Sequence, residues 1–335
     1  MDEPPSHRDT VVHSFRLSSP TMPPRFRRFL KMIAWVLLFQ LLLVNISASI
    51  YAHRLTHYYE GPPSPPASRN IFQKTWQLFT GPRLYRDSLE PLPPFPADTV
   101  MLNAGDVRLH AWYSGHDSSS SCVIFFHGLT GNKSNLSPEA AVLRQMGFNV
   151  MLVDLRGHGK SGGSTGSFGV DETAEVQKAF EWAKGRGNKK LILYGVSLGA
   201  VVCLKAVSDG LVQPAAIIAD MPFGSLHQHL RSRAQVMGFP GEPYGALVCF
   251  WMGVRRGFNG FGHDVAAYAA NVHCPVLLQW GEKDVYVKKE EILQVYESLA
   301  SPDKKLVTYP DANHQSYLGI DPIKWQKEMK QFLSL

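Results

Sequence analysis

The sequence predicts an α/β fold in which a mostly parallel β-sheet is covered by helices on both faces. From residue 98 to the C-terminus, short apolar runs alternate with helical stretches. The runs are continuously apolar, which is typical of parallel strands buried on both faces. The region spans about 240 residues without an internal repeat, so we expect a single domain there.

The elements of this domain are expected in a regular order. A hairpin comes first, with strands at 100–103 and 107–113 around the turn Ala104-Gly105-Asp106. The apolar runs that follow are 122–126, 150–153, 191–194, 215–219, 276–280 and 305–309. The helical stretches are 138–146, 171–184, 198–208, 288–299 and 322–333. Residues 223–270 break the alternation and predict an inserted cap.

An apolar segment, residues 32–52, precedes this domain and contains no formally charged side chain. At about 1.5 Å per residue, a helix of this length spans the roughly 30 Å hydrocarbon core of a bilayer. The nearest basic residues are Arg25, Arg27, Arg28 and Lys31 before the segment and Arg54 after it. The positive-inside rule therefore predicts that residues 1–31 are cytoplasmic and that the folded domain lies across the membrane.

Two other interpretations of residues 32–52 stay open. The small residues Ser47-Ala48-Ser49 are compatible with cleavage of a signal peptide, and a fully buried core helix has the same apolar composition. A retained signal anchor is preferred, because the leader before the apolar run is long for a signal peptide.

Residues 53–97 predict a linker. Two proline clusters, 61–66 and 91–96, are typical of a stiff, extended spacer. Apolar residues between them have rough helical spacing: Ile71, Phe72, Trp76, Leu78 and Phe79. We expect a short helix that packs on the folded domain; a helix lying on the lipid surface is the alternative.

The charge of the chain is concentrated in its N-terminal part. The whole chain has 34 Lys+Arg and 28 Asp+Glu, a net charge of +6. Residues 1–95 account for 11 basic and 6 acidic side chains, so the folded domain retains 23 and 22, a net charge of +1. This distribution indicates a membrane arm and argues against a nucleic-acid-binding body. Four cysteines exclude a disulfide-dense scaffold.

A candidate nucleophile lies between an apolar strand and an apolar helix, in Gly195-Val196-Ser197-Leu198-Gly199. A tight strand-to-helix turn needs glycine on both sides, because a side chain there would clash. The turn exposes the Ser197 hydroxyl and places the amide of Leu198 at the start of the helix, where it can stabilise an oxyanion.

The partners of Ser197 are expected in loops at the same edge of the sheet. His314 follows the last strand and is the candidate base, while Asp284 follows the preceding strand and is the candidate acid that orients it. Glu282 and Asp220 are rival acids. The order Ser197, Asp284, His314 is the one that the α/β-hydrolase topology requires.

The loop after the first parallel strand is expected to complete an oxyanion hole. It reads His127-Gly128-Leu129, in which Gly128 permits a sharp bend and the amide of Leu129 faces the site. His127 is a possible second base, but we expect it to order the loop.

These motifs resemble those of α/β-hydrolase-fold serine hydrolases over residues 98–335. A fourth motif, residues 154–161, matches a turn that such hydrolases share. The resemblance implies that this turn is structural, with Asp154 and Arg156 paired. With a single anchor in front, the layout is similar to that of membrane-tethered α/β-hydrolase-domain proteins. The resemblance implies a catalytic triad but hardly constrains the substrate.

The favoured function is hydrolysis of carboxylic esters or thioesters of lipid-like or acylated molecules, with the cap covering Ser197. A peptidase is the first alternative, for which Glu242 is a candidate group to bind a free amine. An acyltransferase and a non-catalytic scaffold are the others. We expect no cofactor, no metal and no nucleic-acid partner, and the oligomeric state stays open. The histidine pairs 53/57 and 227/229 lack convincing carboxylate partners for a metal site.

Overall fold

The computed structural model describes residues 22–61, 70–87, 89–115 and 119–333. Residues 1–21 of the expected cytoplasmic segment and residues 62–66 of the first proline cluster lie outside this part of the chain. The chain divides into two compact units, residues 1–43 and residues 44–335.

Helix α1 (Pro24–Leu55) contains the expected apolar segment and is long and apolar enough to cross a membrane. Large apolar side chains are exposed along it from Phe26 to Ile46. From Val44 onward the helix belongs to the second unit, where Ala48, Ala52 and Leu55 are fully buried. Because these three recur at helical spacing, they form one face that packs in a protein core. The end of the membrane segment at residue 52 stays a prediction.

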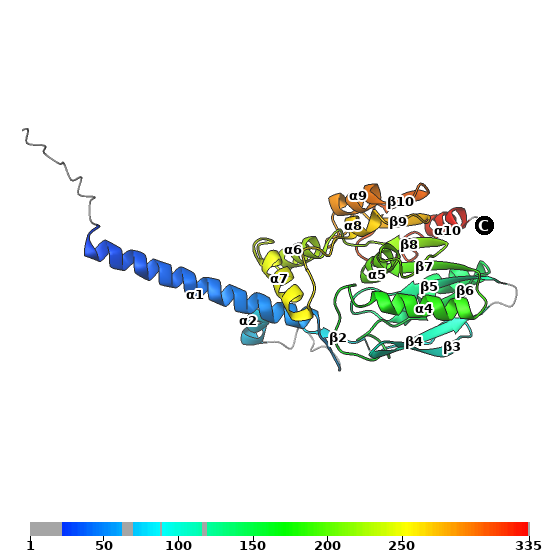
Figure 1. Cartoon of the computed structure of the whole chain (residues 1–335), viewed down its shortest axis with the longest axis horizontal. Coiled ribbons are helices and arrows are strands. Elements are labelled where there is room, and N and C mark those ends of the chain that lie inside the picture. Colours follow the sequence, from blue (N-terminus) through cyan, green and yellow to red (C-terminus); the bar gives the residue numbers. More distant parts are fainter. Residues whose placement is uncertain (1–21, 62–69, 88, 116–118, 334–335) are drawn as a thin grey trace, which may run out of the picture. The chain divides into compact units, whose positions relative to one another are not determined.

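The second unit is built on an eight-stranded sheet with the order β10-β9-β8-β7-β5-β6-β4-β3 (Figure 1). The strands are β3 (Asp98–Ala104), β4 (Val107–Ser114), β5 (Ser121–Phe126), β6 (Asn149–Val153), β7 (Lys190–Val196), β8 (Ala216–Asp220), β9 (Val276–Gly281) and β10 (Lys304–Tyr309). Strand β4 is antiparallel to both β3 and β6, and all other neighbours are parallel. The predicted mostly parallel sheet is confirmed.

Helices cover both faces of this sheet, as predicted. They are α3 (Ser137–Gln145), α4 (Thr173–Gly185), α5 (Leu198–Ser208), α9 (Lys289–Ser298) and α10 (Pro322–Phe332). Two consecutive residues of β5 illustrate the two cores. Ile124 packs on the face under α4, α5 and α9, and Phe125 packs on the face under α3 and α10. Both side chains are fully buried, which explains why the strand reads as continuously apolar.

The predicted insertion lies between β8 and β9 and forms three helices, α6 (Leu226–Val236), α7 (Tyr244–Arg256) and α8 (Val265–Ala269). Helices α6 and α7 pack against each other beside the sheet (Figure 1). The C-terminal turns of α1 contact this insertion, since Ser47 Oγ lies 3.0 Å from the Tyr244 hydroxyl and Tyr51 donates a hydrogen bond to the sulfur of Met237.

The linker contains the expected short helix, α2 (Ile71–Thr80), between the short strands β1 (Tyr58–Tyr59) and β2 (Leu84–Tyr85). Among the side chains of α2 that the structure describes, Thr80 in the last turn is buried, whereas Ile71, Phe72 and Trp76 are 69%, 81% and 60% exposed. These exposed side chains favour the lipid-surface alternative.

The described part of the linker is not a free spacer. Strands β1 and β2 pair with each other, and Tyr58 and Leu84 are buried. Arg86 donates a hydrogen bond to the carbonyl of Gly157 at 3.0 Å. A two-stranded pairing this short carries no sequence pattern. The extended conformation of the proline clusters at 61–66 and 91–96 stays a prediction.

Candidate active site

Ser197 occupies a strained turn between β7 and α5. Its φ is 51°, a left-handed value that a residue with a side chain adopts only at a cost. A Cβ on Gly195 would lie 2.4 Å from the backbone nitrogen of Ala200, and one on Gly199 would lie 2.0 Å from the carbonyl oxygen of Phe126. The predicted need for glycine on both sides of the serine is confirmed.

Ser197, His314 and Asp284 lie in a hydrogen-bonded row. His314 Nε2 is 3.0 Å from Ser197 Oγ, and His314 Nδ1 is 2.7 Å from Asp284 Oδ2. The other oxygen of Asp284 accepts hydrogen bonds from the backbone N–H groups of Tyr286 and Val287 at 2.8 and 3.0 Å. A carboxylate on Nδ1 holds the proton there, so Nε2 faces the serine as an acceptor.

The rival acids do not reach His314. Glu282 is exposed. Asp220 is buried and accepts hydrogen bonds from the Tyr194 hydroxyl at 2.6 Å and from the Gln279 amide at 2.7 Å. Burial raises the pKa of Asp220 to about 7. The geometry thus selects Asp284 among the three candidates.

The loop after β5 runs close beside Ser197. A Cβ on Gly128 would lie 3.5 Å from Ser197 Cβ, so the backbone there approaches the candidate nucleophile closely. Leu129 and Leu198 line the same cavity as Ser197. Leu198 is the first residue of α5, where backbone N–H groups have no partner within the helix. The two expected oxyanion-hole residues are therefore neighbours of the serine.

Two buried histidines hold this loop. His127 Nδ1 lies 2.8 Å from the Gly128 carbonyl, and its Nε2 accepts the N–H of Leu155 at 3.1 Å. His158 Nε2 accepts the N–H of Thr130 at 3.1 Å. Burial lowers the pKa of His127 to about 4 and that of His158 to about 3, so both rings stay neutral and can accept. The predicted ordering role of His127 is confirmed; that of His158 was not predicted.

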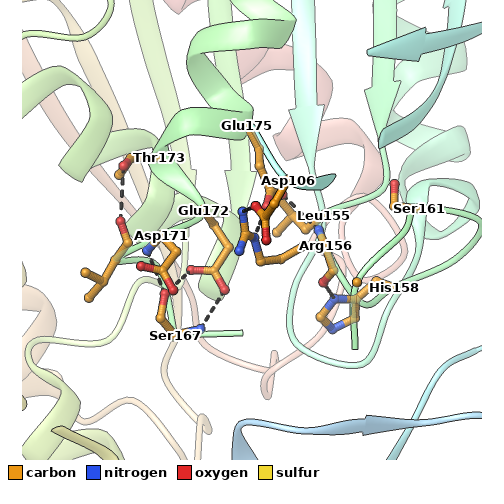
Figure 2. Close-up of polar contacts among 12 residues, drawn as sticks. Asp106, Leu155, Arg156, His158, Ser161, Ser167, Asp171, Glu172, Thr173 and Glu175 are labelled. Atoms are coloured by element: carbon orange, nitrogen blue, oxygen red, sulfur yellow. Dashed lines mark hydrogen bonds and ion pairs between the residues drawn. The ribbon is translucent and has the colours of Figure 1, made fainter. Parts of the chain in front are cut away.

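The turn at residues 154–161 supports the same loop through buried ion pairs. Lys133 Nζ lies 2.6 Å from Asp154 and 2.7 Å from Glu90, with all three side chains at most 2% exposed. Arg156 instead pairs with Glu175 on α4 and, at 3.4 Å, with Asp106 (Figure 2). The pairing of Asp154 with Arg156 was wrong, because the partners come from segments distant in sequence.

Ser197 opens into a cavity of about 400 Å³. The cap contributes His229 and Arg233 of α6 to its wall. The predicted position of the cap beside Ser197 is thus confirmed. Glu242, the expected amine-binding group, is not a wall residue; it pairs with His227 at 2.7 Å on the surface, so that expectation was wrong. No cluster of three metal-ligating side chains occurs within the described ranges.

Comparisons with known proteins agree with this architecture. Residues 117–239 match the family model described as serine aminopeptidase, S33. The uncharacterized protein YqkD of Bacillus subtilis is 27% identical over 223 residues, which are 65% of this chain and 72% of that protein. Lysophosphatidylserine lipase ABHD12 of Danio rerio is 28% identical over 202 residues, 58% of this chain and 51% of that protein.

A solved structure decides the fold. Esterase Pf2001 of Pyrococcus furiosus superimposes with a TM-score of 0.62 at 26% identity, covering 74% of this chain and 97% of the esterase. The chain has the α/β-hydrolase fold. The family model ends before Asp284 and His314, so it covers Ser197 but not the other two side chains of the row.

Sequence reasoning missed three groups that lie at the candidate site. His158 was assigned only to a structural turn, and His229 and Arg233 were not considered as wall residues. The i,i+4 spacing of His229 and Arg233 on a polar helix was a visible signal that they share one face. Nothing in the sequence indicated that this face is turned toward Ser197.

Proposed function

We propose that this α/β-hydrolase-fold protein is a serine hydrolase that cleaves carboxylic ester or thioester bonds through an acyl-enzyme. The observation that carries the proposal is the hydrogen-bonded row from Ser197 through His314 to Asp284 at the cavity wall. A serine hydroxyl is a weak nucleophile unless a positioned base takes its proton. This row supplies both the base and the group that orients it.

Each step then uses a group with the required geometry. His314 Nε2 takes the proton of Ser197 as its oxygen attacks the acyl carbonyl carbon. The amides of Leu129 and Leu198 stabilise the oxyanion, and His314 returns the proton to the leaving alcohol or thiol. Water, deprotonated by the same histidine, then attacks the acyl-enzyme and releases the carboxylic acid. Asp284 stabilises the imidazolium of His314 during both acylation and deacylation.

An ester or thioester is the favoured substrate, because two similar proteins are named as an esterase and a lipase. A peptidase is the second candidate, favoured by the description of the matching family and by Glu139. This carboxyl lies at the cavity and is 2% exposed, and its Oε2 has no hydrogen-bond partner within the described chain. Hydrolysis of an aminoacyl 4-nitroanilide would favour the peptidase over the esterase.

We further propose that α1 anchors the enzyme in a membrane, with residues 1–31 in the cytoplasm and the hydrolase domain on the opposite side. The exposed apolar stretch from Met32 to Ile46 and the basic residues before it support this topology. Protease treatment of sealed vesicles tests it: a tag at residue 1 and a tag at residue 335 should be cut from opposite faces.

A fluorophosphonate probe tests the chemistry directly. In membranes that hold the full chain, wild type should be labelled, while Ser197→Ala and His314→Ala should not. Ser208→Ala, at the far end of α5, is the matched control and should label as wild type does. A folded, membrane-inserted wild type that resists the probe would contradict the proposal.

A further inference from the structure

Two polar side chains of cap helix α6 face the cavity and are one helical turn apart. His229 and Arg233 both line the wall that also contains Ser197 and His314. The start of α6 is held by the side chain of Ser225, which caps it, and by the N–H of Leu226, which donates to the His263 carbonyl at 3.0 Å. The helix is thus a fixed support for these two groups.

Arg233 is a cation without a carboxylate partner among the described residues. Its guanidinium carbon lies 5.8 Å from the ring centre of Tyr286, whose ring in turn lies edge-on to His314 at 5.5 Å. Tyr51 is a side-chain hydrogen-bond partner of the guanidinium, whereas the Nε of Arg233 is buried and makes no hydrogen bond within the described chain. A partly buried cation without a counterion is costly, which indicates that the partner is supplied by a ligand.

His229 is the second side chain of α6 with buried polar atoms that lack a hydrogen-bond partner among the described residues. It is 5% exposed, and neither ring nitrogen has a hydrogen-bond partner in the described part of the chain. Its ring lies 4.8 Å from that of Phe223 and 5.8 Å from that of Phe168, so two aromatic side chains hold it in place. A buried imidazole normally satisfies both nitrogens. Here both are left available beside the cavity.

The other ionisable side chains on the cavity wall include two carboxyls, which already accept hydrogen bonds. Arg233 is the only Arg or Lys among the described wall residues, and the candidate acid Asp284 is not one of them. The carboxyls on the wall are Glu139, which accepts a hydrogen bond from Ser316, and Asp220, which accepts two. Burial raises the pKa of both carboxyls, to about 7 in Asp220.

We infer that His229 and Arg233 form a subsite for an anionic group of the acyl substrate, a carboxylate or a phosphate. This subsite rests on the proposed function and specifies the substrate class of the enzyme. The substrate is an ester whose anionic group lies several bonds from the scissile carbonyl, since Tyr286 separates Arg233 from His314. Arg233 donates charge-assisted hydrogen bonds to the anion, and neutral His229 donates one more. The neutral imidazole adds a donor without a second charge.

Five esters of matched size test the subsite on the detergent-solubilised full chain. 4-Nitrophenyl butyrate is neutral, its hemisuccinate analogue carries a carboxylate and its 4-aminobutyrate analogue an ammonium group. 1-Butyrylglycerol and its 3-phosphate place the anion on the alcohol side. We expect wild type to prefer an anionic ester, and the two series show whether a carboxylate or a phosphate is preferred.

Substitution of Arg233 should then change selectivity. Arg233→Gln should lower kcat/KM by about 10- to 100-fold more for the preferred anionic ester than for its neutral counterpart. Arg233→Lys should lose less, and His229→Phe, which keeps the aromatic contacts, should lose selectivity in the same direction. Arg231→Gln, on the exposed side of the same helix, is the matched control and should retain wild-type selectivity.

Equal losses for neutral and anionic esters, or a preference for the ammonium ester, would overturn the subsite. A binding measurement keeps the inference separate from the chemistry. In Ser197→Ala, the preferred anionic ester should raise Tm more than its neutral counterpart, and Ser197→Ala/Arg233→Gln should abolish that difference. If the fluorophosphonate does not label wild type while the anionic ester still raises Tm more than the neutral ester, the proposed function fails and the subsite stands. If wild type is labelled and the two esters raise Tm equally, the subsite fails and the proposed function stands.

Discussion

The row of Ser197, His314 and Asp284 and the cap helix α6 are built in opposite ways. On the sheet side, Ser197, His314 and Asp284 each have their hydrogen-bond partners in place. On the cap side, His229 and the Nε of Arg233 are buried without a partner in the described chain. Groups that are satisfied before substrate arrives are suited to chemistry, because their geometry is preorganised. Groups whose polar atoms lack hydrogen-bond partners are suited to recognition, because the substrate can supply those partners.

The largest expected effect is on the sheet side. Asp284→Asn removes the carboxylate that sets the tautomer of His314, and we expect kcat to fall by roughly 10⁴-fold. Glu282→Gln removes a neighbouring exposed carboxylate and should leave kcat within about 2-fold. Initial rates with 4-nitrophenyl butyrate measure both. A similar loss in the two variants would contradict the assignment of Asp284.

A second test concerns the support beneath the oxyanion loop. Lys133→Met leaves Asp154 and Glu90 buried without their cation, and we expect a loss of about 3–5 kcal/mol in the free energy of unfolding. Lys160 also approaches Glu90, at 3.4 Å, but its side chain is 61% exposed. Lys160→Met is therefore the control and should cost less than about 1 kcal/mol. Urea denaturation compares the two, and similar losses would contradict the buried network.

The cap side predicts a pH dependence of stability. His263 is 1% exposed, contacts the Phe168 carbonyl and the Tyr268 hydroxyl, and burial lowers its pKa to about 4. The unfolded chain, with a His pKa near 6.5, then binds more protons between these values. This residue's contribution is therefore present above pH 6.5 and is lost as pH falls toward 4, by about 3 kcal/mol.

His263→Gln should consequently flatten the acid side of the stability profile. The variant is expected to be less stable at pH 7, but its free energy of unfolding should fall less between pH 6.5 and pH 4. Since other buried groups titrate in both proteins, the difference between the two profiles isolates His263. Parallel profiles in urea titrations would show that this histidine protonates equally in the folded and unfolded states.

The smallest expected effect separates positioning from chemistry. His158→Phe removes the acceptor of the Thr130 N–H and should lower kcat by about 10- to 30-fold, with little change in KM, because the oxyanion loop loses its fixed geometry. His273→Gln, on the surface, is the control. If His158→Phe raised KM alone, the loop would serve binding and not the transition state.

Much of the candidate site was predictable because its residues follow strands. Ser197 comes directly after β7, and Asp284 and His314 lie in the loops that follow β9 and β10. Parallel strands bring their carboxyl ends to one edge of the sheet. Where a partner's position is not indicated by the end of a strand, prediction failed. Lys133 pairs with Asp154, and Arg156 pairs with Glu175, in place of the expected Asp154–Arg156 pair.

The sequence by itself determined the α/β architecture, the order of Ser197, Asp284 and His314, and the apolar character of α1. These properties are local, because they depend on periodicity and on which residues follow each strand. Only the tertiary structure decided where α1 enters the core at Ser47, which cations neutralise the buried carboxyls, and which face of α6 meets the cavity. These depend on packing between segments far apart in the chain, for which no local pattern exists.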